Sequence, residues 1–173
     1  MVSPAVYDPA EISCAEFILT AMMIVRAESN DASRLTEIAL AAKRHWKYPE
    51  RWIELWTPLL TITPEFVSNA DVWKALVDED IAGFYALLYE GDKAVLEHLW
   101  ILPRFIGKGI GRDLVNHARA RCVQKSCKIL EIDSDPNARG FYEKMGAIKT
   151  GERVGEIDGQ ERILPVLTIK LIR

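Results

Sequence analysis

The sequence predicts a single α/β domain built on a mixed β-sheet. Segments with strand-like and helix-like hydrophobic spacing alternate along the chain. Three consecutive strand patterns between residues 71 and 102 are joined by tight polar links, which predicts an antiparallel meander. Segment 94–132 then has the pattern strand, helix, strand, which predicts a parallel β-α-β unit. A chain of 173 residues, 49% of them hydrophobic, is long enough for one full core.

Residues 1–22 are interpreted as an N-terminal extension, followed by a single domain over residues 23–173. Asp8 and Pro9 have the pattern of a helix start, which predicts a short helix; a loosely attached leader fits the same residues. The first 17 residues contain no Lys or Arg, unlike a signal peptide. The apolar stretch 17–25 is shorter than the ~18 residues of a membrane span, so we expect a cytoplasmic protein with no membrane partner.

The first part of the domain is predicted to contain one strand and two helical segments. They are expected at residues 23–27, at residues 32–44 after a capping Asp31, and from Pro49 onward. The second helical segment is expected to break at Pro58, and residues 62–67 are expected to form a loop.

The meander and the elements after it follow from turn residues and hydrophobic spacing. The three strands are expected at residues 71–77, 81–89 and 94–102. Pro103 ends the third strand, and a glycine-rich loop leads into a helix over residues 112–125. The last elements are expected to be a strand at 128–132, a helix from Asp135-Pro136 to Lys144, and a hairpin of residues 147–154 and 162–172 around Asp158-Gly159.

Charge and cysteine usage exclude several classes of protein. The chain has 22 basic and 25 acidic residues and a net charge of −3, so we expect no nucleic-acid partner. Its three cysteines, Cys14, Cys122 and Cys127, are an odd number, which argues against a disulfide framework. Their spacing does not match a metal-binding pair, and we expect no metal.

Three alternating glycines, Gly107, Gly109 and Gly111, lie between a predicted strand and a predicted helix. At such a junction, unpaired backbone N–H groups and the helix dipole favour an anion such as phosphate, and Lys108 and Arg112 add positive charge. The Walker pattern fails because it requires Lys and then Ser or Thr after its last glycine. The dinucleotide pattern fails because no glycine follows Gly109 at the required spacing. A purely structural glycine turn fits the same pattern.

Two further runs, LEHLWILP at residues 96–103 and NARGFYEKMGA at residues 137–147, make the chain from residue 23 onward resemble the GNAT N-acetyltransferase superfamily. The predicted order of elements is also that of this family. The resemblance implies a three-layer fold and acetyl-CoA as cosubstrate. One departure is Ile106, where the family usually has Gln or Arg. The residues that the resemblance assigns to cofactor binding are Leu99, Trp100, Ile101, Gly107, Lys108, Gly109, Ile110, Gly111, Arg112 and Asn137.

Acetyl transfer to an amine requires a base, since an alkylammonium has a pKa near 10.4. Strand alternation is expected to place Glu97 and Leu99 on one face of the third meander strand and His98 on the other. Glu97 corresponds to a position that bases occupy in the family, and we expect it to be buried among apolar neighbours, which makes a carboxylate a better base. His98 is the alternative base. A simple ion pair for Glu97 and a packing role for His98 remain the alternatives.

The resemblance gives Tyr142 the role of the acid that protonates the leaving thiol, with core packing as the alternative. Trp46 and Tyr48 are candidates for the acceptor pocket, again with packing as the alternative. The expected function is direct transfer of an acetyl group from acetyl-CoA to a primary amine of a small molecule or peptide, without a metal or a covalent acyl-enzyme. A non-catalytic CoA-binding module is the alternative, and homodimers are common in the family.

Overall fold

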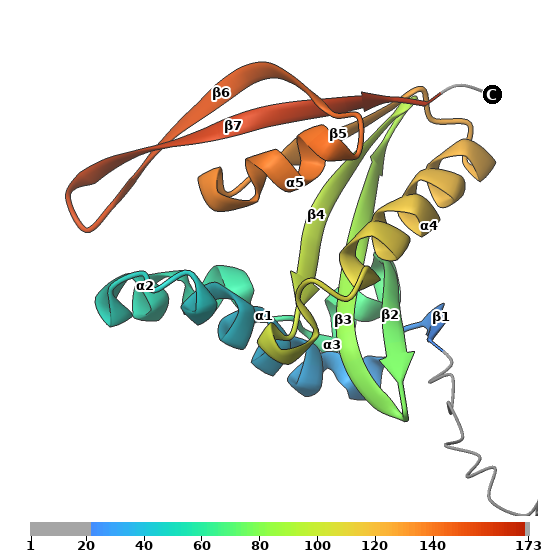
Figure 1. The fold of residues 1–173 in the computed structure, drawn as a ribbon, viewed down its shortest axis with the longest axis horizontal. Coiled ribbons are helices and arrows are strands. Elements are labelled where there is room, and N and C mark those ends of the chain that lie inside the picture. The colour runs from blue at the N-terminus through green and yellow to red at the C-terminus, as the bar shows by residue number, and fades with distance from the viewer. Residues whose placement is uncertain (1–21, 172–173) are drawn as a thin grey trace, which may run out of the picture.

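The computed structural model describes residues 22–171 and contains a seven-stranded sheet with helices on both faces (Figure 1). The strand order is β1-β2-β3-β4-β5-β7-β6, and β4 and β5 are parallel neighbours. The expected mixed α/β fold is therefore confirmed. The extension expected over residues 1–22, with its short helix, lies outside the described residues apart from Met22. The strands are β1 (Met23–Arg26), β2 (Asp71–Val77), β3 (Asp80–Glu90), β4 (Lys93–Ile101), β5 (Ile129–Asp133), β6 (Ile148–Ile157) and β7 (Gln160–Lys170).

The helices form two layers, one on each face of the sheet. They are α1 (Ala32–His45), α2 (Glu50–Leu60) and α3 (Pro64–Asn69) on one face, and α4 (Ile110–Gln124) and α5 (Arg139–Lys144) on the other. Phe84 and Ala86 of β3 belong to the core beneath α1, whereas Tyr85 and Leu87 belong to the core beneath α4. This division follows from the alternation of side chains along a strand. The result is a three-layer domain with two hydrophobic cores.

Two helical segments differ from the sequence prediction. α2 continues through Pro58 instead of breaking there, and α3 occupies residues that were expected to form a loop. Pro58 removes one backbone donor, but Ile53 and Leu60 on either side of it are buried, and their packing retains the helix. α3 forms because the Thr63 hydroxyl accepts a hydrogen bond from the Phe66 N–H at 3.1 Å, directly before a proline at the first helical position.

The other predicted elements are confirmed, with boundaries that differ by a few residues. α4 begins at Ile110 because Gly109, its N-cap, has the left-handed backbone conformation. The hairpin strands pair as far as Ile157 and Gln160. Asp158 and Gly159 both have positive φ, which matches the tight two-residue turn that keeps antiparallel strands in register.

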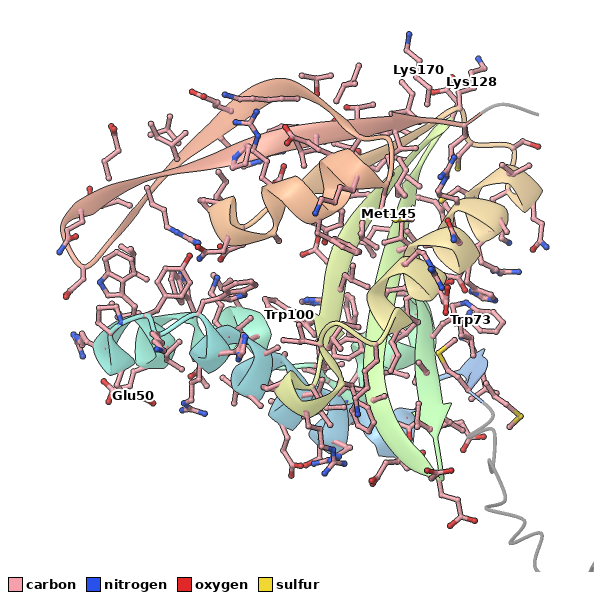
Figure 2. All side chains as sticks on the ribbon, viewed as in Figure 1. Glu50, Trp73, Trp100, Lys128, Met145 and Lys170 are labelled. Atoms are coloured by element: carbon pink, nitrogen blue, oxygen red, sulfur yellow. The ribbon has the colours of Figure 1, made fainter. Side chains whose placement is uncertain are left out.

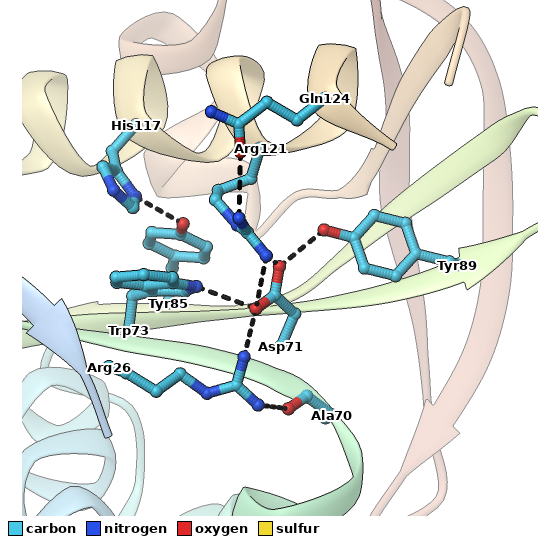
Figure 3. A network of polar contacts seen from close by, with 9 residues as sticks. All are labelled: Arg26, Ala70, Asp71, Trp73, Tyr85, Tyr89, His117, Arg121 and Gln124. Atoms are coloured by element: carbon cyan, nitrogen blue, oxygen red, sulfur yellow. Dashed lines mark hydrogen bonds and ion pairs between the residues drawn. The ribbon is translucent and has the colours of Figure 1, made fainter. Parts of the chain in front are cut away.

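The carboxylate of Asp71, buried at the start of β2, joins several elements (Figure 3). It accepts hydrogen bonds from Trp73 Nε1 at 2.8 Å, from the Tyr89 hydroxyl at 2.6 Å and from Arg121 Nε of α4 at 3.1 Å, and it pairs with Arg26 of β1. Burial acts to raise the pKa of Asp71, but these donors outweigh burial and lower it. The network therefore fixes both the edge strand and α4 on the sheet.

β4 carries a β-bulge at Glu97. Leu96 lies opposite Leu87 and His98 lies opposite Ala86, so Glu97 is an extra residue in β4. The bulge changes which face of the sheet the following side chains point to. Leu96 and Leu99 both face the core beneath α4, whereas strict alternation would place them on opposite faces. The predicted separation of His98 from Leu99 is confirmed, but the alternation does not extend back to Leu96, because the bulge shifts it by one residue.

β4 and β5 separate after a short paired segment. Their parallel pairing covers Lys93–Ile129, Ala94–Leu130 and Val95–Glu131, and the rest of β4 is paired only with β3 (Figure 1). The edge of β4 that faces β5 beyond Val95 therefore has backbone groups that are free to bind a ligand. Within residues 22–171, no helix is both long and apolar enough to cross a membrane.

Candidate active site

A cavity of about 400 Å³ opens where β4 and β5 separate. Both strands line it, together with the glycine loop, α5 and the end of α1. Trp100 projects from β4 toward the side of α1 and α2 (Figure 2). The lining residues include Trp46, Glu97, Leu99, Trp100, Ile101, Gly107, Gly109, Gly111, Arg112, Asp133, Asp135, Asn137, Phe141 and Tyr142.

The glycine loop presents unpaired backbone donors to this cavity. Gly107 and Gly109 have φ angles of 82° and 86°, a conformation that favours glycine. Among the described residues, no acceptor is present for the N–H groups of residues 107 and 109–112. Gly111 is needed for packing, since an added Cβ would lie 3.3 Å from the Phe141 ring. The loop therefore has free amides and a helix N-terminus, an arrangement that suits a phosphate.

Two basic side chains stand beside these amides. The Arg112 guanidinium lines the cavity and donates from Nε to Asp113 at 3.0 Å. The Lys108 ammonium lies 5.1 Å from the centre of the Phe105 ring. Lys108 does not line the cavity, and the Ile110 side chain is buried in the core, so Ile110 offers the site only its backbone. Ile106 is exposed and carries no charge to the loop.

Tyr142 lies on α5 with its ring buried in the core and its residue lining the cavity. Among the described residues, the Tyr142 hydroxyl makes no hydrogen bond, and no fully enclosed polar side-chain atom lacks a partner. The hydroxyl is therefore not fully enclosed, and because Tyr142 lines the cavity, it is accessible from there. Burial, followed by the nearby Asp135 carboxylate, raises the pKa of Tyr142 above its ordinary value, so the phenol keeps its proton.

The two candidate bases occupy different places. Glu97 lines the cavity, but it is exposed, so the expectation that it is buried among apolar neighbours is wrong. The bulge turns its side chain out of the regular pleat of β4. Among residues 22–171, no cation pairs with Glu97. His98 does not line the cavity; it packs against Phe66 and Phe84 on the other side of the sheet.

Of the two residues expected at the acceptor pocket, Trp46 lines the cavity and Tyr48 does not. Trp46 lines the cavity and is 39% exposed. Tyr48 lies behind the wall, where its hydroxyl donates to Asp135 at 2.8 Å and accepts from Asn137 Nδ2 at 2.9 Å. From the sequence, Asp135 is predicted only to begin a helix, and the buried Lys43 is not predicted as its partner. A lysine four residues after Ala39 on the apolar stripe of α1 was the available signal.

Comparison with known proteins agrees with this geometry. Residues 59–160 match the family model described as the acetyltransferase (GNAT) domain. The chain belongs to the GNAT acetyltransferase family. It is accordingly an acetyltransferase that uses acetyl-CoA. Cysteines and other metal-binding side chains form no cluster of three or more within residues 22–171.

Other GNAT proteins resemble this chain in sequence and in fold. The peptidyl-lysine N-acetyltransferase YjaB of Salmonella typhimurium is 30% identical over 69% of this chain and 89% of its own length. YjaB of Escherichia coli is 30% identical over 67% of this chain and 74% of its own length. A GCN5-related N-acetyltransferase from Rhodopseudomonas palustris superposes with a TM-score of 0.73 at 20% identity, covering 86% of this chain and 95% of that one. The PaiA N-acetyltransferase from Thermoplasma acidophilum, solved with coenzyme A, gives 0.68 at 22% identity, covering 87% and 99%.

Proposed function

We propose that this GNAT acetyltransferase acetylates the side-chain amine of lysine in a protein or peptide, by direct attack of the amine. The observation that carries the proposal is the gap between β4 and β5, which ends at the unpaired amides of the glycine loop. The free edge of β4, the glycine loop, the Tyr142 side chain and the Glu97 carboxylate all line one cavity, which supports the proposal. The relatives named peptidyl-lysine N-acetyltransferases support the lysine acceptor.

The residues present fit acetyl-CoA, which supplies the acetyl group as an activated thioester. The amides of Gly107, Gly109 and Gly111, with the Arg112 guanidinium, hold its phosphates. The β4 edge at Leu99–Ile101 pairs with its amide arm, and Asn137 gives that arm a further hydrogen bond. Ile106 offers no charge there, so the backbone amides carry most of the phosphate binding.

Glu97 is the base in this proposal. An ammonium must lose a proton before it can attack, and Glu97 is a carboxylate that lines the cavity and has no cation partner among the described residues. Its exposure allows it to attract the lysine ammonium and to take the proton directly or through a water. Trp46 presents an exposed indole to the same cavity, and an indole face suits both the aliphatic stem and the charge of lysine.

Tyr142 is the acid. Its hydroxyl reaches the cavity, and its raised pKa keeps the proton on the phenol until the departing sulfur takes it. His98 is not part of the proposed mechanism, because it lies outside the cavity and its Nδ1 already accepts a hydrogen bond from Trp100.

Direct attack is also supported by the position of the cysteines. Cys122 and Cys127 are buried, unpaired and absent from the cavity lining, and burial raises the pKa of the Cys122 thiol to about 12. A thiol of this kind is a poor nucleophile.

A cytoplasmic location and a homodimer belong to the same proposal. Unpaired thiols fit a reducing compartment. The exposed side chains of Ile148, Val154 and Ile163 on the β6–β7 hairpin offer an apolar surface to a second copy of the chain.

The test is a thiol-release assay with acetyl-CoA and a panel of acceptors: lysine peptides, the same peptides with acetylated lysine, free amino acids and polyamines. We expect release with the lysine peptides and acetyl-lysine in the product by mass spectrometry. Release with free amino acids or polyamines alone would replace the proposed acceptor. Binding of CoA without thiol release for the lysine peptides would contradict the lysine acceptor.

A further inference from the structure

We infer that Asp135 is a positioning residue: with Lys43, Tyr48 and Arg162 it fixes the amide of Asn137 so that only its carbonyl oxygen faces the cavity. The inference rests on the proposed function of Asn137 as a ligand of the acetyl-CoA arm. It assigns a role to Asp135, which lines the cavity, and to Lys43, Tyr48 and Arg162, which do not line it.

The Asp135 carboxylate collects donors from three separate parts of the chain. Its Oδ2 accepts from Lys43 Nζ of α1 at 2.6 Å and from Arg162 of β7 at 2.9 Å. Its Oδ1 accepts from the Tyr48 hydroxyl at 2.8 Å and from the Asn137 N–H at 3.0 Å. Both oxygens are thus held, and the side chain is only 12% exposed. The carboxylate cannot rotate without breaking charge-assisted hydrogen bonds.

Both side-chain N–H groups of Asn137 donate hydrogen bonds within the same cluster. Its Nδ2 donates to the Tyr48 hydroxyl at 2.9 Å and to Asp135 Oδ1 at 3.1 Å. An amide group has two N–H donors and one carbonyl oxygen, so only the carbonyl is left for a ligand. Asn137 lines the cavity, and its orientation therefore selects an N–H donor, such as an amide N–H of the acetyl-CoA arm.

Aromatic rings keep the two cations in place. Lys43 Nζ lies 4.2 Å from the centre of the Trp56 ring, and the Arg162 guanidinium lies 4.6 Å from it, with the Tyr48 ring close to both. Burial acts to raise the pKa of Asp135, but Lys43 and the hydrogen-bond donors outweigh it and lower the pKa. The group therefore stays a carboxylate, which can only accept, and Asn137 is compelled to donate to it.

The test is a double-mutant cycle on CoA affinity, measured by isothermal titration calorimetry with Tyr48→Phe, Asn137→Ala and the double variant. Tyr48→Phe keeps the ring and removes only the hydroxyl. We expect each single change to weaken CoA binding about three- to tenfold, as for loss of one hydrogen bond. In the Asn137→Ala background, Tyr48→Phe should have no further effect, because Tyr48 acts through Asn137. In steady state, Tyr48→Phe should raise KM for acetyl-CoA and leave kcat unchanged.

Tyr89→Phe is the matched control, since its hydroxyl also donates to a buried carboxylate, that of Asp71, away from the cavity. It should leave CoA affinity unchanged. Additive effects in the cycle, or a Tyr48→Phe variant with wild-type affinity while Asn137→Ala is weakened, would refute the positioning role alone. If Asn137→Ala bound CoA with wild-type affinity, Asn137 would not be a cosubstrate ligand and this inference would be refuted. The proposed function would be unaffected, because the thiol-release assay with lysine peptides tests it separately.

Discussion

The indole Nε1 of Trp100 donates a hydrogen bond to Nδ1 of His98 at 3.2 Å. Accepting at Nδ1 places the imidazole proton on Nε2, so the ring is neutral and has no free lone pair for a substrate proton. The ring also packs edge-on against Phe66, with centroids 5.4 Å apart. Burial lowers the pKa of His98 to about 4. His98 is thus a neutral packing residue of the core beneath α1.

This burial predicts an acid sensitivity of the fold. Because the pKa of His98 falls from 6.5 to about 4 on folding, its contribution is complete above pH 6.5 and is lost as the pH falls through about 4. This pKa change corresponds to at most about 3.4 kcal/mol of unfolding free energy. His98→Phe should flatten the dependence of urea-unfolding free energy on pH in this window. His45→Phe, at an exposed position, should not. The same pH slope in His98→Phe as in the wild type would contradict the assignment.

Tyr142→Phe should lower kcat about a hundredfold, because the departing sulfur loses its proton donor. Affinity for CoA should remain at the wild-type level, since the ring still packs in the core and only the hydroxyl is removed. Thiol release and calorimetry measure the two quantities. A variant with wild-type kcat would remove Tyr142 from the mechanism.

Glu97→Gln keeps the size of the bulge residue and removes its charge. We expect kcat/KM for a lysine peptide to fall about a hundredfold, with residual activity that rises with pH as more of the amine becomes neutral. Glu90→Gln, an exposed change at the end of β3, is the control and should have no effect on the rate. If Glu97→Gln retained the wild-type pH profile, another group would have to be the base.

Gly109→Ala should weaken CoA binding at least tenfold and destabilise the fold by about 1 kcal/mol. Its φ of 86° disfavours a side chain, and the added Cβ would lie 3.3 Å from the Arg112 guanidinium at the phosphate site. Gly91→Ala is the matched control: its φ of 63° is also positive, but it lies in a turn with nothing within 4 Å. It should cost similar stability in urea unfolding and leave CoA affinity unchanged. Equal affinity in both variants would argue against the loop as the phosphate site.

The elements of this fold could be predicted largely from the sequence, because hydrophobic spacing and turn residues are local signals. The faces of β4 could not. The bulge at Glu97 is a property of the pairing between β4 and β3, and nothing in residues 93–101 alone shows where one residue will be left unpaired. Strict alternation therefore separates Leu96 from Leu99, whereas both side chains face the core beneath α4.

The candidate site likewise has parts that could be predicted from local sequence signals and parts that could not. The glycine loop was visible as a motif, and the family resemblance supplied Tyr142 and Asn137. The cluster around Asp135 was not visible, because Lys43 is 92 residues from Asp135 in sequence and Arg162 is 27 residues away. These contacts form because the fold brings α1 and β7 close to Asp135, and no local sequence pattern predicts that proximity.

The short parallel pairing between β4 and β5 bears on how a ligand binds. Seven strands form one sheet, yet only three residue pairs hold the β1–β4 portion to the β5–β7 portion along that line. The candidate site thus lies where these two portions of the sheet are joined over the shortest paired length. In the proposed function, the acetyl-CoA arm hydrogen-bonds along this free edge of β4, so cosubstrate binding adds backbone contacts at the junction where the sheet has the fewest.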